Sequence, residues 1–374
     1  MKRVTRFWRR VTDGMELNQL WKQFHADALS SYRLYSREVD ATRTPGMRKG
    51  RYALHVANQI FWAFLEKLTP ARRVLLLIAL VLLLFFNDIE FSSSTGNGRV
   101  VVGPFNGALW GGLLLLALLV LEIADRVVMK RDLQIAKEIQ TWLLPASPPV
   151  VAGLEIAFAT RPANTVAGDY YDVFSRAAGS GESDRFVLAV ADVAGKSVPA
   201  AMLMATFQAS LKTLAQTPGS LTDLVGRMNS YACSNSQNGR RFTTALIAEY
   251  EPATRRLTYV NAGHNPPMLR RGKGAVERLA AGGVPFGIVD GAPYEAGTLT
   301  LEPGDWLVIF TDGVTEAENE QKAEYGEVRL AAVVNTNAGL APQAMLGAIM
   351  QDVDHFVGDA PQHDDATLLL VKAV

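Results

Sequence analysis

The sequence has few of the residues on which disulfide, zinc and thiol chemistry depend. Its 374 residues include one cysteine and five histidines. One cysteine excludes an intramolecular disulfide and a cysteine zinc cluster, and no two histidines have the H-x-x-x-H spacing of a zinc hydrolase. Cys233 lacks the arginine six residues later that a cysteine phosphatase requires, because position 239 is glycine. We therefore expect a protein of a reducing compartment, with a small buried cysteine.

The sequence also lacks net charge, since 37 Lys and Arg residues balance 37 Asp and Glu residues. The balance hides an asymmetry. Residues 1–73 hold 15 basic and 6 acidic side chains, and residues 74–374 hold 22 and 31. The two parts therefore carry +9 and −9. A basic end of this kind indicates a membrane or a nucleic-acid surface as the partner.

Two apolar runs favour the membrane and argue against a nucleic acid. Residues 74–86 contain no polar side chain, and residues 101–121 contain only Asn106. Both runs are apolar on all sides, as lipid-facing helices are. We predict a transmembrane hairpin over 71–124, with spans at about 70–88 and 103–122. The alternative is a pair of buried helices in a soluble core, because 13 strictly apolar residues are short for a span.

Basic residues flank the hairpin on its outer sides, at Arg72 and Arg73 before it and at Arg126, Lys130 and Arg131 after it. The positive-inside rule therefore predicts a multi-pass protein of the cytoplasmic membrane with both ends in the cytoplasm. Residues 1–70 form a basic cytoplasmic region. Its first ten residues are either an interfacial anchor on anionic lipid or a disordered basic arm.

A helix is predicted over 122–146, because no glycine or proline interrupts it before Pro145. One apolar stripe at helical spacing is formed by Ile123, Val127, Ile135, Ile139 and Trp142. The stripe either folds against the domain that follows or pairs with the same helix of a second copy, as a homodimer over 122–144. Ser-Pro-Pro at 147–149 marks a domain boundary.

Residues 151–374 are predicted to form an α+β domain. Apolar segments bounded by Gly, Pro, Asn or Asp predict strands at 154–160, 185–193, 242–250, 256–263, 305–313 and 366–373. Helices are predicted at 198–216, 220–236 and 341–357. Grouped strand pairs and helix pairs favour a sandwich over a wound parallel sheet. The segment AGKS at 194–197 resembles the end of a phosphate-binding loop, but Val190 stands where that motif needs glycine.

Aspartates stand at the ends of several of these strands: Asp169, Asp172, Asp192, Asp312, Asp364 and Asp365. Each alone is typical of a turn or a helix cap. Together they would converge if the strand ends share one rim, and such carboxylates repel unless cations neutralise them. Oxygen ligands select Mg²⁺ or Mn²⁺, and a pair of such ions activates water for phosphoryl transfer.

The order of LQIAKEIQTWLLP, RPANTVAGDYYDVF, LAVADVAGKSVPAAMLMA, YVNAGHNPPML, PGDWLVIFTDGVTEAEN and HDDATLLLV resembles the bacterial SpoIIE/RsbU-type branch of the PPM serine/threonine protein phosphatases. The resemblance covers about residues 131–374. It implies an α-β-β-α sandwich with two Mn²⁺ or Mg²⁺ ions at one end. It also implies that Asp169 and Asp192 bridge the ions, that the Val193 carbonyl lies beside them, and that Asp312 and Asp364 are ligands.

Other residues receive secondary roles from the same resemblance. Asp365 and Asp172 are neighbours of the ligands, and Arg161 is a weak candidate for binding phosphate. His264 and Asn265 either form a tight turn or contact the substrate. Ala194 stands where many eukaryotic relatives have a histidine proposed as general acid, so water is expected to protonate the leaving group.

The resemblance implies a membrane-tethered phosphatase for phosphoserine or phosphothreonine, with a phosphorylated STAS anti-anti-sigma regulator as substrate in partner-switching signalling. A non-enzymatic membrane scaffold or sensor that binds a regulatory partner is the alternative. A nucleotide phosphodiesterase would share the carboxylates but not the order of the motifs.

Overall fold

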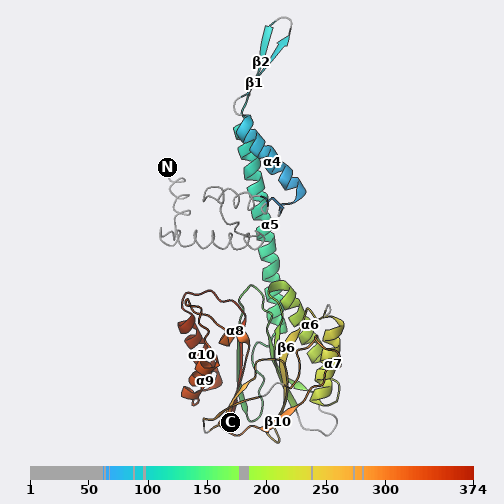
Figure 1. Cartoon of the computed structure of the whole chain (residues 1–374), viewed down its shortest axis with the longest axis vertical. Coiled ribbons are helices and arrows are strands. Elements are labelled where there is room, and N and C mark those ends of the chain that lie inside the picture. The colour runs from blue at the N-terminus through green and yellow to red at the C-terminus, as the bar shows by residue number, and fades with distance from the viewer. Residues whose placement is uncertain are drawn as a thin grey trace, which may run out of the picture. The chain divides into compact units, whose positions relative to one another are not determined.

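The structure is a computed structural model, and the chain divides into two compact units, residues 1–127 and 128–374. Figure 1 shows the elements of both. The predicted basic region is almost entirely outside the described residues. The structure describes residues 62, 65–66, 68–86, 89–95, 98–176, 185–236, 239–272, 274–279 and 282–374.

The described part of the first unit is a pair of helices joined by a β-hairpin. Helix α4 (Pro70–Phe85) precedes strands β1 (Ile89–Thr95) and β2 (Gly98–Phe105), and α5 (Gly107–Leu143) follows them. The two helices pack through small residues: Ala79 is fully buried, and a Cβ on Gly111 would lie 2.8 Å from the Ala79 carbonyl oxygen. Arg72 of α4 forms ion pairs with Glu122 and Asp125 of α5.

The predicted hairpin of two spans is not confirmed. Among the described helices, α5 alone is long and apolar enough to cross a membrane, with a mean hydropathy of 2.2 in its most apolar window. Helix α4 has 16 residues, about 24 Å at 1.5 Å per residue, which is short of a bilayer core of about 30 Å. The predicted second span and the predicted linker helix are one continuous helix, because nothing between them breaks α5.

The second unit contains two five-stranded sheets, in each of which neighbouring strands run antiparallel. The first sheet has the strand order β10 (Gly297–Thr300), β7 (Arg256–Ala262), β6 (Thr243–Glu251), β5 (Arg185–Val193) and β4 (Tyr170–Arg176). The second has the order β3 (Leu154–Arg161), β12 (Ala366–Ala373), β11 (Trp306–Phe310), β8 (Met268–Arg270) and β9 (Val276–Arg278).

Helices cover the outer faces of both sheets. Figure 1 shows α6 (Ser197–Ala215) and α7 (Leu221–Ser234) on one side, and α9 (Glu327–Thr336) and α10 (Pro342–Val357) on the other. Because each central strand is buried on both faces, its sequence is a nearly continuous apolar run. In β5, Val187 and Ala189 pack toward α6 and α7, and Leu188 packs between the sheets. This is the predicted α-β-β-α sandwich.

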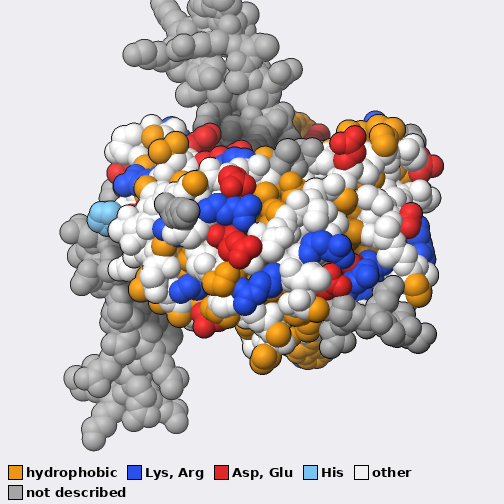
Figure 2. Space-filling model, turned by 90° about the horizontal axis from the view of Figure 1, so that it is seen from below, with side chains coloured by type: hydrophobic (Ala, Val, Ile, Leu, Met, Phe, Trp, Pro, Cys, Tyr) orange, Lys and Arg blue, Asp and Glu red, His pale blue; other side chains and the backbone are white. Residues whose placement is uncertain are grey.

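The elements predicted in this unit are present, with ends that differ by at most a few residues. The described structure adds strands β4, β8, β9 and β10, the single turn α8 (Asp312–Thr315) and helix α9. Strand β4 was not predicted from the sequence, because YYDVFSR contains an aspartate, which is buried in the structure, and is therefore not a continuous apolar run. Figure 2 shows one face of the molecule, on which Lys and Arg side chains are interspersed with Asp and Glu side chains.

Candidate metal and phosphate site

The fold brings five aspartates to one end of the sandwich. Asp169 immediately precedes β4, Asp192 is the last but one residue of β5, and Asp312 begins α8 directly after β11. Asp364 and Asp365 immediately precede β12. In the first sheet, β4 and β5 are neighbours, and their ends carry Asp169 and Asp192. In the second sheet, β11 and β12 are neighbours, and their ends carry Asp312, Asp364 and Asp365. The carboxylates consequently act on one another electrostatically, and each influences the pKa of at least one other member of the group.

Burial and mutual repulsion both act on these acids. Burial and then the charge of Asp192 raise the pKa of Asp169 well above its ordinary value. Burial and the charges of Asp312 and Asp364 raise the pKa of Asp192 to about 7. The pKa of Asp312 is raised too, by burial and then by Asp364. A set of carboxylates that resist ionisation together is a set that cations would stabilise.

Asp169 is held from below by threonine hydroxyls. Its side chain is 1% exposed, and its Oδ2 accepts a hydrogen bond of 2.8 Å from Thr311 Oγ1. The Thr311 hydroxyl oxygen in turn accepts a 2.9 Å bond from the Thr367 backbone N–H. Strands β11 and β12 thus both support this carboxylate.

Asp365 binds the loop that carries Asp169. Its Oδ1 accepts a bond of 2.7 Å from the Ala163 N–H, and its Oδ2 accepts one of 2.6 Å from the Gly168 N–H. The loop can lie this close because Gly168 has no side chain: a Cβ there would lie 3.3 Å from the Val193 carbonyl oxygen and 3.2 Å from the Ala200 Cβ. Asp365 is thereby engaged on both oxygens by backbone donors, which suits a positioning residue better than a metal ligand.

Lys196 brings a positive charge to the open side of the cluster. Its Nζ lies 2.8 Å from Asp364 Oδ2 and donates a 2.6 Å bond to the His363 carbonyl oxygen. Ser197, the next residue, adopts a left-handed conformation with φ of 65°, at the start of α6. Both partners of the ion pair are about half exposed, at 55% and 46%, so the contact can open without a large desolvation cost.

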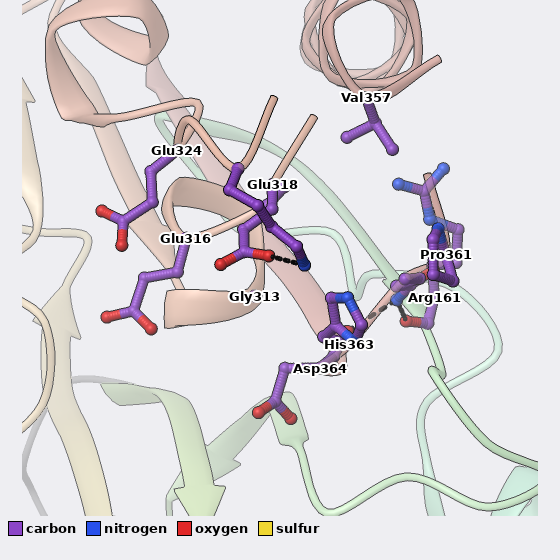
Figure 3. A pocket seen from close by; sticks show the side chains of 12 residues that line it. Arg161, Gly313, Glu316, Glu318, Glu324, Val357, Pro361, His363 and Asp364 are labelled. Carbon is purple, nitrogen blue, oxygen red and sulfur yellow. Dashed lines mark hydrogen bonds and ion pairs between the residues drawn. The ribbon is translucent and has the colours of Figure 1, made fainter. Parts of the chain in front are cut away.

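A cavity of about 380 Å³ adjoins Asp364. Figure 3 shows Glu316, Glu318 and Glu324 on one side of it and Arg161 on the other, with His363 and Asp364 between them. The Arg161 guanidinium pairs with Asp354 of α10, and the Arg161 carbonyl accepts a bond from Gln362. Arg161 therefore lines the space next to the acid cluster but is engaged by another carboxylate.

Asp172 and His264 have partners of their own outside the group of clustered aspartates. Asp172 is buried within β4, where Tyr170 Oη donates to it at 2.8 Å and Lys212 Nζ lies 2.9 Å away, so it belongs to the packing of β4 against α6. His264 and Asn265 follow β7 in a turn. The His264 N–H donates to Asn261 Oδ1 at 2.7 Å, and Asn261 Nδ2 donates back to the His264 carbonyl at 3.0 Å.

His264 lies near the end of β5 that carries Asp192. Its Nδ1 is 3.1 Å from Thr244 Oγ1, and Thr244 pairs with Asp192 across β5 and β6. The imidazole is 3% exposed, and burial lowers its pKa to about 4. It is therefore a neutral, buried group that supports the strand end, which agrees with the tight-turn interpretation.

The donor set fits hard divalent cations. It consists of carboxylates and the Val193 carbonyl, and Mg²⁺ and Mn²⁺ prefer such oxygen ligands. Among the described residues, no three His, Cys, Asp or Glu side chains stand close enough together to hold an ion as they are placed. This is the expected arrangement for like charges that repel one another, and Gly168 keeps open the approach to the Val193 carbonyl.

Two residues of the site had no role in the sequence analysis. Thr311 precedes Asp312 and looked like an ordinary residue of a buried strand, and Lys196 lay in a segment considered only as an incomplete phosphate-binding loop. The cue for Lys196 was a basic residue four positions after Asp192, directly before a helix. For Thr311 the cue was a hydroxyl in an otherwise apolar strand.

The chain is similar to several known proteins. The family model described as stage II sporulation protein E (SpoIIE) matches residues 182–374, just over half of the chain. Protein IcfG of Synechocystis is 27% identical over 314 residues, which are 76% of this chain and 48% of IcfG. Phosphoserine phosphatase RsbU of Bacillus subtilis is 28% identical over 245 residues, 65% of this chain and 70% of RsbU. The chain thus spans about half the length of IcfG.

The fold is also that of a solved phosphatase domain. The SiaA-PP2C domain of Pseudomonas aeruginosa superposes with a TM-score of 0.58 at 22% sequence identity. The match covers 67% of this chain and 99% of that domain. At this identity the likeness supports the fold alone.

Proposed function

Because the chain belongs to the SpoIIE family of PPM-type phosphatases, we propose that it is a metal-dependent phosphatase for phosphoserine or phosphothreonine in proteins. The observation that carries the proposal is the group of aspartates at one rim of the sandwich, with pKa values raised by burial and by one another. Because these carboxylates repel one another, their ionised form is favourable only with bound cations. RsbU, which is named a phosphoserine phosphatase, supports the same reaction class.

Asp169, Asp192, Asp312 and Asp364, with the Val193 carbonyl, would hold two Mn²⁺ or Mg²⁺ ions. When bound, the ions supply an activated water and neutralise charge on the phosphoryl oxygens. The chain's own contribution is orientation. Thr311 and Asp365 fix the direction of Asp169, and the backbone of β5 presents Asp192 next to it.

Lys196 and Arg161 are two cations that could bind the phosphate. Lys196 reaches Asp364 from the start of α6, and Arg161 lines the cavity on the other side. Each is paired with a carboxylate in the absence of substrate, so each can exchange that partner for a phosphate oxygen. Ala194 stands where many eukaryotic relatives have a histidine, and we expect water to protonate the leaving serine oxygen.

The substrate class we infer is a phosphorylated STAS-type regulator of a partner-switching system, as the family resemblance implies. A cavity that is flanked by Glu316, Glu318 and Glu324 disfavours a strongly acidic partner beside the phosphoserine.

We also propose that the first unit tethers the enzyme to the cytoplasmic membrane as a two-helix hairpin, with the phosphatase domain in the cytoplasm. Its helices expose large apolar side chains, such as Leu84 at 71% and Leu116 at 56%, and bury small ones. Close approach through Gly111 and Ala79 is typical of helix pairs in lipid. A short α4 can be accommodated by local thinning of the bilayer.

The test is release of phosphate from phosphorylated STAS proteins and serine phosphopeptides by the purified full chain, with Mn²⁺ or with excess EDTA. We expect Mn²⁺-dependent hydrolysis, and a loss of at least about a thousandfold in kcat/KM for Asp192→Ala and Asp312→Ala. Asp172→Ala serves as a control for loss of a buried carboxylate outside the rim, with its folding checked by circular dichroism. Full activity of the rim variants in EDTA would refute the proposal.

The alternative function is a scaffold or sensor that binds a regulator without hydrolysing it. Such a protein would bind the phosphorylated regulator in EDTA and would need no Mn²⁺. Calorimetric titration of the full chain with Mn²⁺ separates the two, since a scaffold has no reason to bind metal.

A further inference from the structure

Helix α5 contributes one buried side chain to the second unit, and that side chain is polar. Among residues 128–143, all of which the structure describes, Gln140 alone is buried, at 7% exposed. The apolar residues around it, Ile139 and Trp142, are exposed at 47% and 79%. Burying an amide is costly unless its donor and acceptor are both satisfied. Gln140 therefore has a specific partner and is not a filler of the core.

That partner is the backbone of Ala167. Gln140 Nε2 donates a bond of 2.7 Å to the Ala167 carbonyl oxygen, and Gln140 Oε1 accepts a bond of 2.9 Å from the Ala167 N–H. The side-chain amide thus pairs with both backbone groups of one residue, as a neighbouring strand would. Ala167 is 1% exposed, so water cannot take over these bonds.

Ala167 is two residues before Asp169, and the intervening Gly168 is also fixed. The Gly168 N–H donates to Asp365, and its Cα lies against the Val193 carbonyl and Ala200. With planar peptide bonds on either side, constraints on Ala167 and Gly168 leave little freedom in the direction of the Asp169 side chain. Gln140 supplies the constraint that comes from outside the sandwich.

We propose that Gln140 is a positioning residue for Asp169, through which the seating of α5 on the second unit sets the affinity of the site for divalent metal. The proposal rests on the proposed function, because it takes Asp169 as a metal ligand. Through the Gln140 side chain, a movement of α5 would change the position of the loop that carries Asp169. Displacement of α5 would break two hydrogen bonds on the loop and leave Asp365 to hold it alone.

Two substitutions test this in the full chain. In Gln140→Glu, a carboxylate oxygen would face the Ala167 carbonyl and repel it, and Gln140→Met keeps the length of the side chain without either bond. Gln134→Glu is the matched control, because Gln134 is an exposed glutamine on the same helix. Mn²⁺ binding is followed by the electron paramagnetic resonance of free Mn²⁺.

We expect both Gln140 variants to bind Mn²⁺ about 10–100-fold more weakly than wild type, as is usual when the support of a metal ligand is removed. Activity should recover at saturating Mn²⁺ with an unchanged KM for phosphopeptide, which a general loss of structure would not produce. Gln134→Glu should equal wild type. Mn²⁺ affinities within twofold of wild type in both Gln140 variants would overturn the proposal.

A measurement on the wild-type chain covers the case in which the variants fold poorly. Coupling is reciprocal, so saturating Mn²⁺ should slow hydrogen exchange at the Ala167 amide and in the last turns of α5. Slowing at Asp169 without any change at Ala167 or α5 would also overturn the proposal. If the wild-type chain binds no Mn²⁺ at all, the proposed function fails. If wild type and both variants bind it equally, only the role of Gln140 fails.

Discussion

Asp169 and Asp364 stand at the same rim of the sandwich, yet their surroundings differ. Asp169 is 1% exposed and rests on Thr311, and the loop before it is bound by Asp365. The Asp364 side chain is 46% exposed, and it pairs with the long, flexible side chain of Lys196. We call these the buried half and the open half of the site. Hydrogen bonds within the fold hold the carboxylate of the buried half in place. In the open half, the exposed ion pair can be replaced by a contact with another partner.

The difference assigns separate tasks to the two halves. Fixed, desolvated carboxylates favour metal affinity, because no reorganisation is needed when the ion binds. An exposed ion pair beside a cavity favours substrate exchange, because its opening costs about 1 kcal/mol or less. Substitutions that disturb the buried half should therefore weaken metal binding, and those that disturb the open half should lower turnover without weakening metal binding.

Among substitutions that leave the proposed metal ligands in place, the largest effect is expected from Asp365→Asn in the buried half. An asparagine NH₂ would face either the Ala163 or the Gly168 N–H and leave that buried donor unsatisfied, at a cost of about 1–3 kcal/mol. The loop would shift, and Mn²⁺ affinity should fall about 10–100-fold. Calorimetric titration measures the affinity, with the exposed Asp359→Asn as control. Equal affinities in the two variants would contradict the assignment of Asp365 to the loop.

Lys196→Met should act in the opposite direction on metal. Without its ion pair, Asp364 is free to bind a cation, and Mn²⁺ affinity should rise by up to about fivefold. The loss of a cation beside the phosphate should lower kcat/KM for a phosphopeptide roughly tenfold, the equivalent of about 1.4 kcal/mol. Lys322→Met, which removes another lysine of the cavity wall, paired with Glu318, should change neither value by more than about twofold.

A weaker Mn²⁺ affinity in Lys196→Met would show that the lysine supports the metal site, and the division into two halves would then be wrong. An unchanged kcat/KM would remove Lys196 from the set of groups that contact phosphate.

Part of the site could be predicted from apolar runs in the sequence that end in an acid. Runs such as VLAVADV and WLVIFTD predict strands that are buried on both faces, and an acid at the end of such a run must stand at the rim of a sheet. That argument reaches Asp192 and Asp312 without any structure. Which strand ends share a rim depends on the strand order, and the pairing of β12 with both β3 and β11 joins segments about 200 and 60 residues apart in the chain. Here the family resemblance was needed.

Other contacts were beyond the reach of the sequence for a physical reason. Gln140, Lys196 and Thr311 act through hydrogen bonds to residues between 27 and 168 positions away in the chain, and no sequence periodicity predicts such bonds. Asp172 was misleading, because the sequence does not distinguish a metal ligand from a carboxylate that pairs with a lysine, here Lys212, inside a packed interface. The N-terminal helices were predicted from composition alone, which does not reveal that α4 ends after 16 residues.

The smallest expected effect concerns pH and sharpens the description of the buried half. Burial lowers the pKa of His264 to about 4, against about 6.5 in an unfolded chain. The unfolded state therefore binds more protons between these values, and stability is lost as pH falls through 6.5 toward 4. For His264 alone the loss at pH 5 is roughly 1–2 kcal/mol. The raised pKa of Asp192 acts with the opposite sign, because the folded state then holds the extra proton.

The two contributions are separated by substitution. In His264→Gln, the titrating group is removed and an amide can still pair with Thr244. Denaturant unfolding of the metal-free chain at pH 8, 6.5 and 5 should show that the variant gains stability relative to wild type as pH falls, while the contribution of Asp192 cancels in the difference. A constant difference across this range would mean that His264 is accessible to protons in the folded state. In that event His264 could not be a neutral support for the end of β5, and the boundary of the buried half would lie at Asp192 itself.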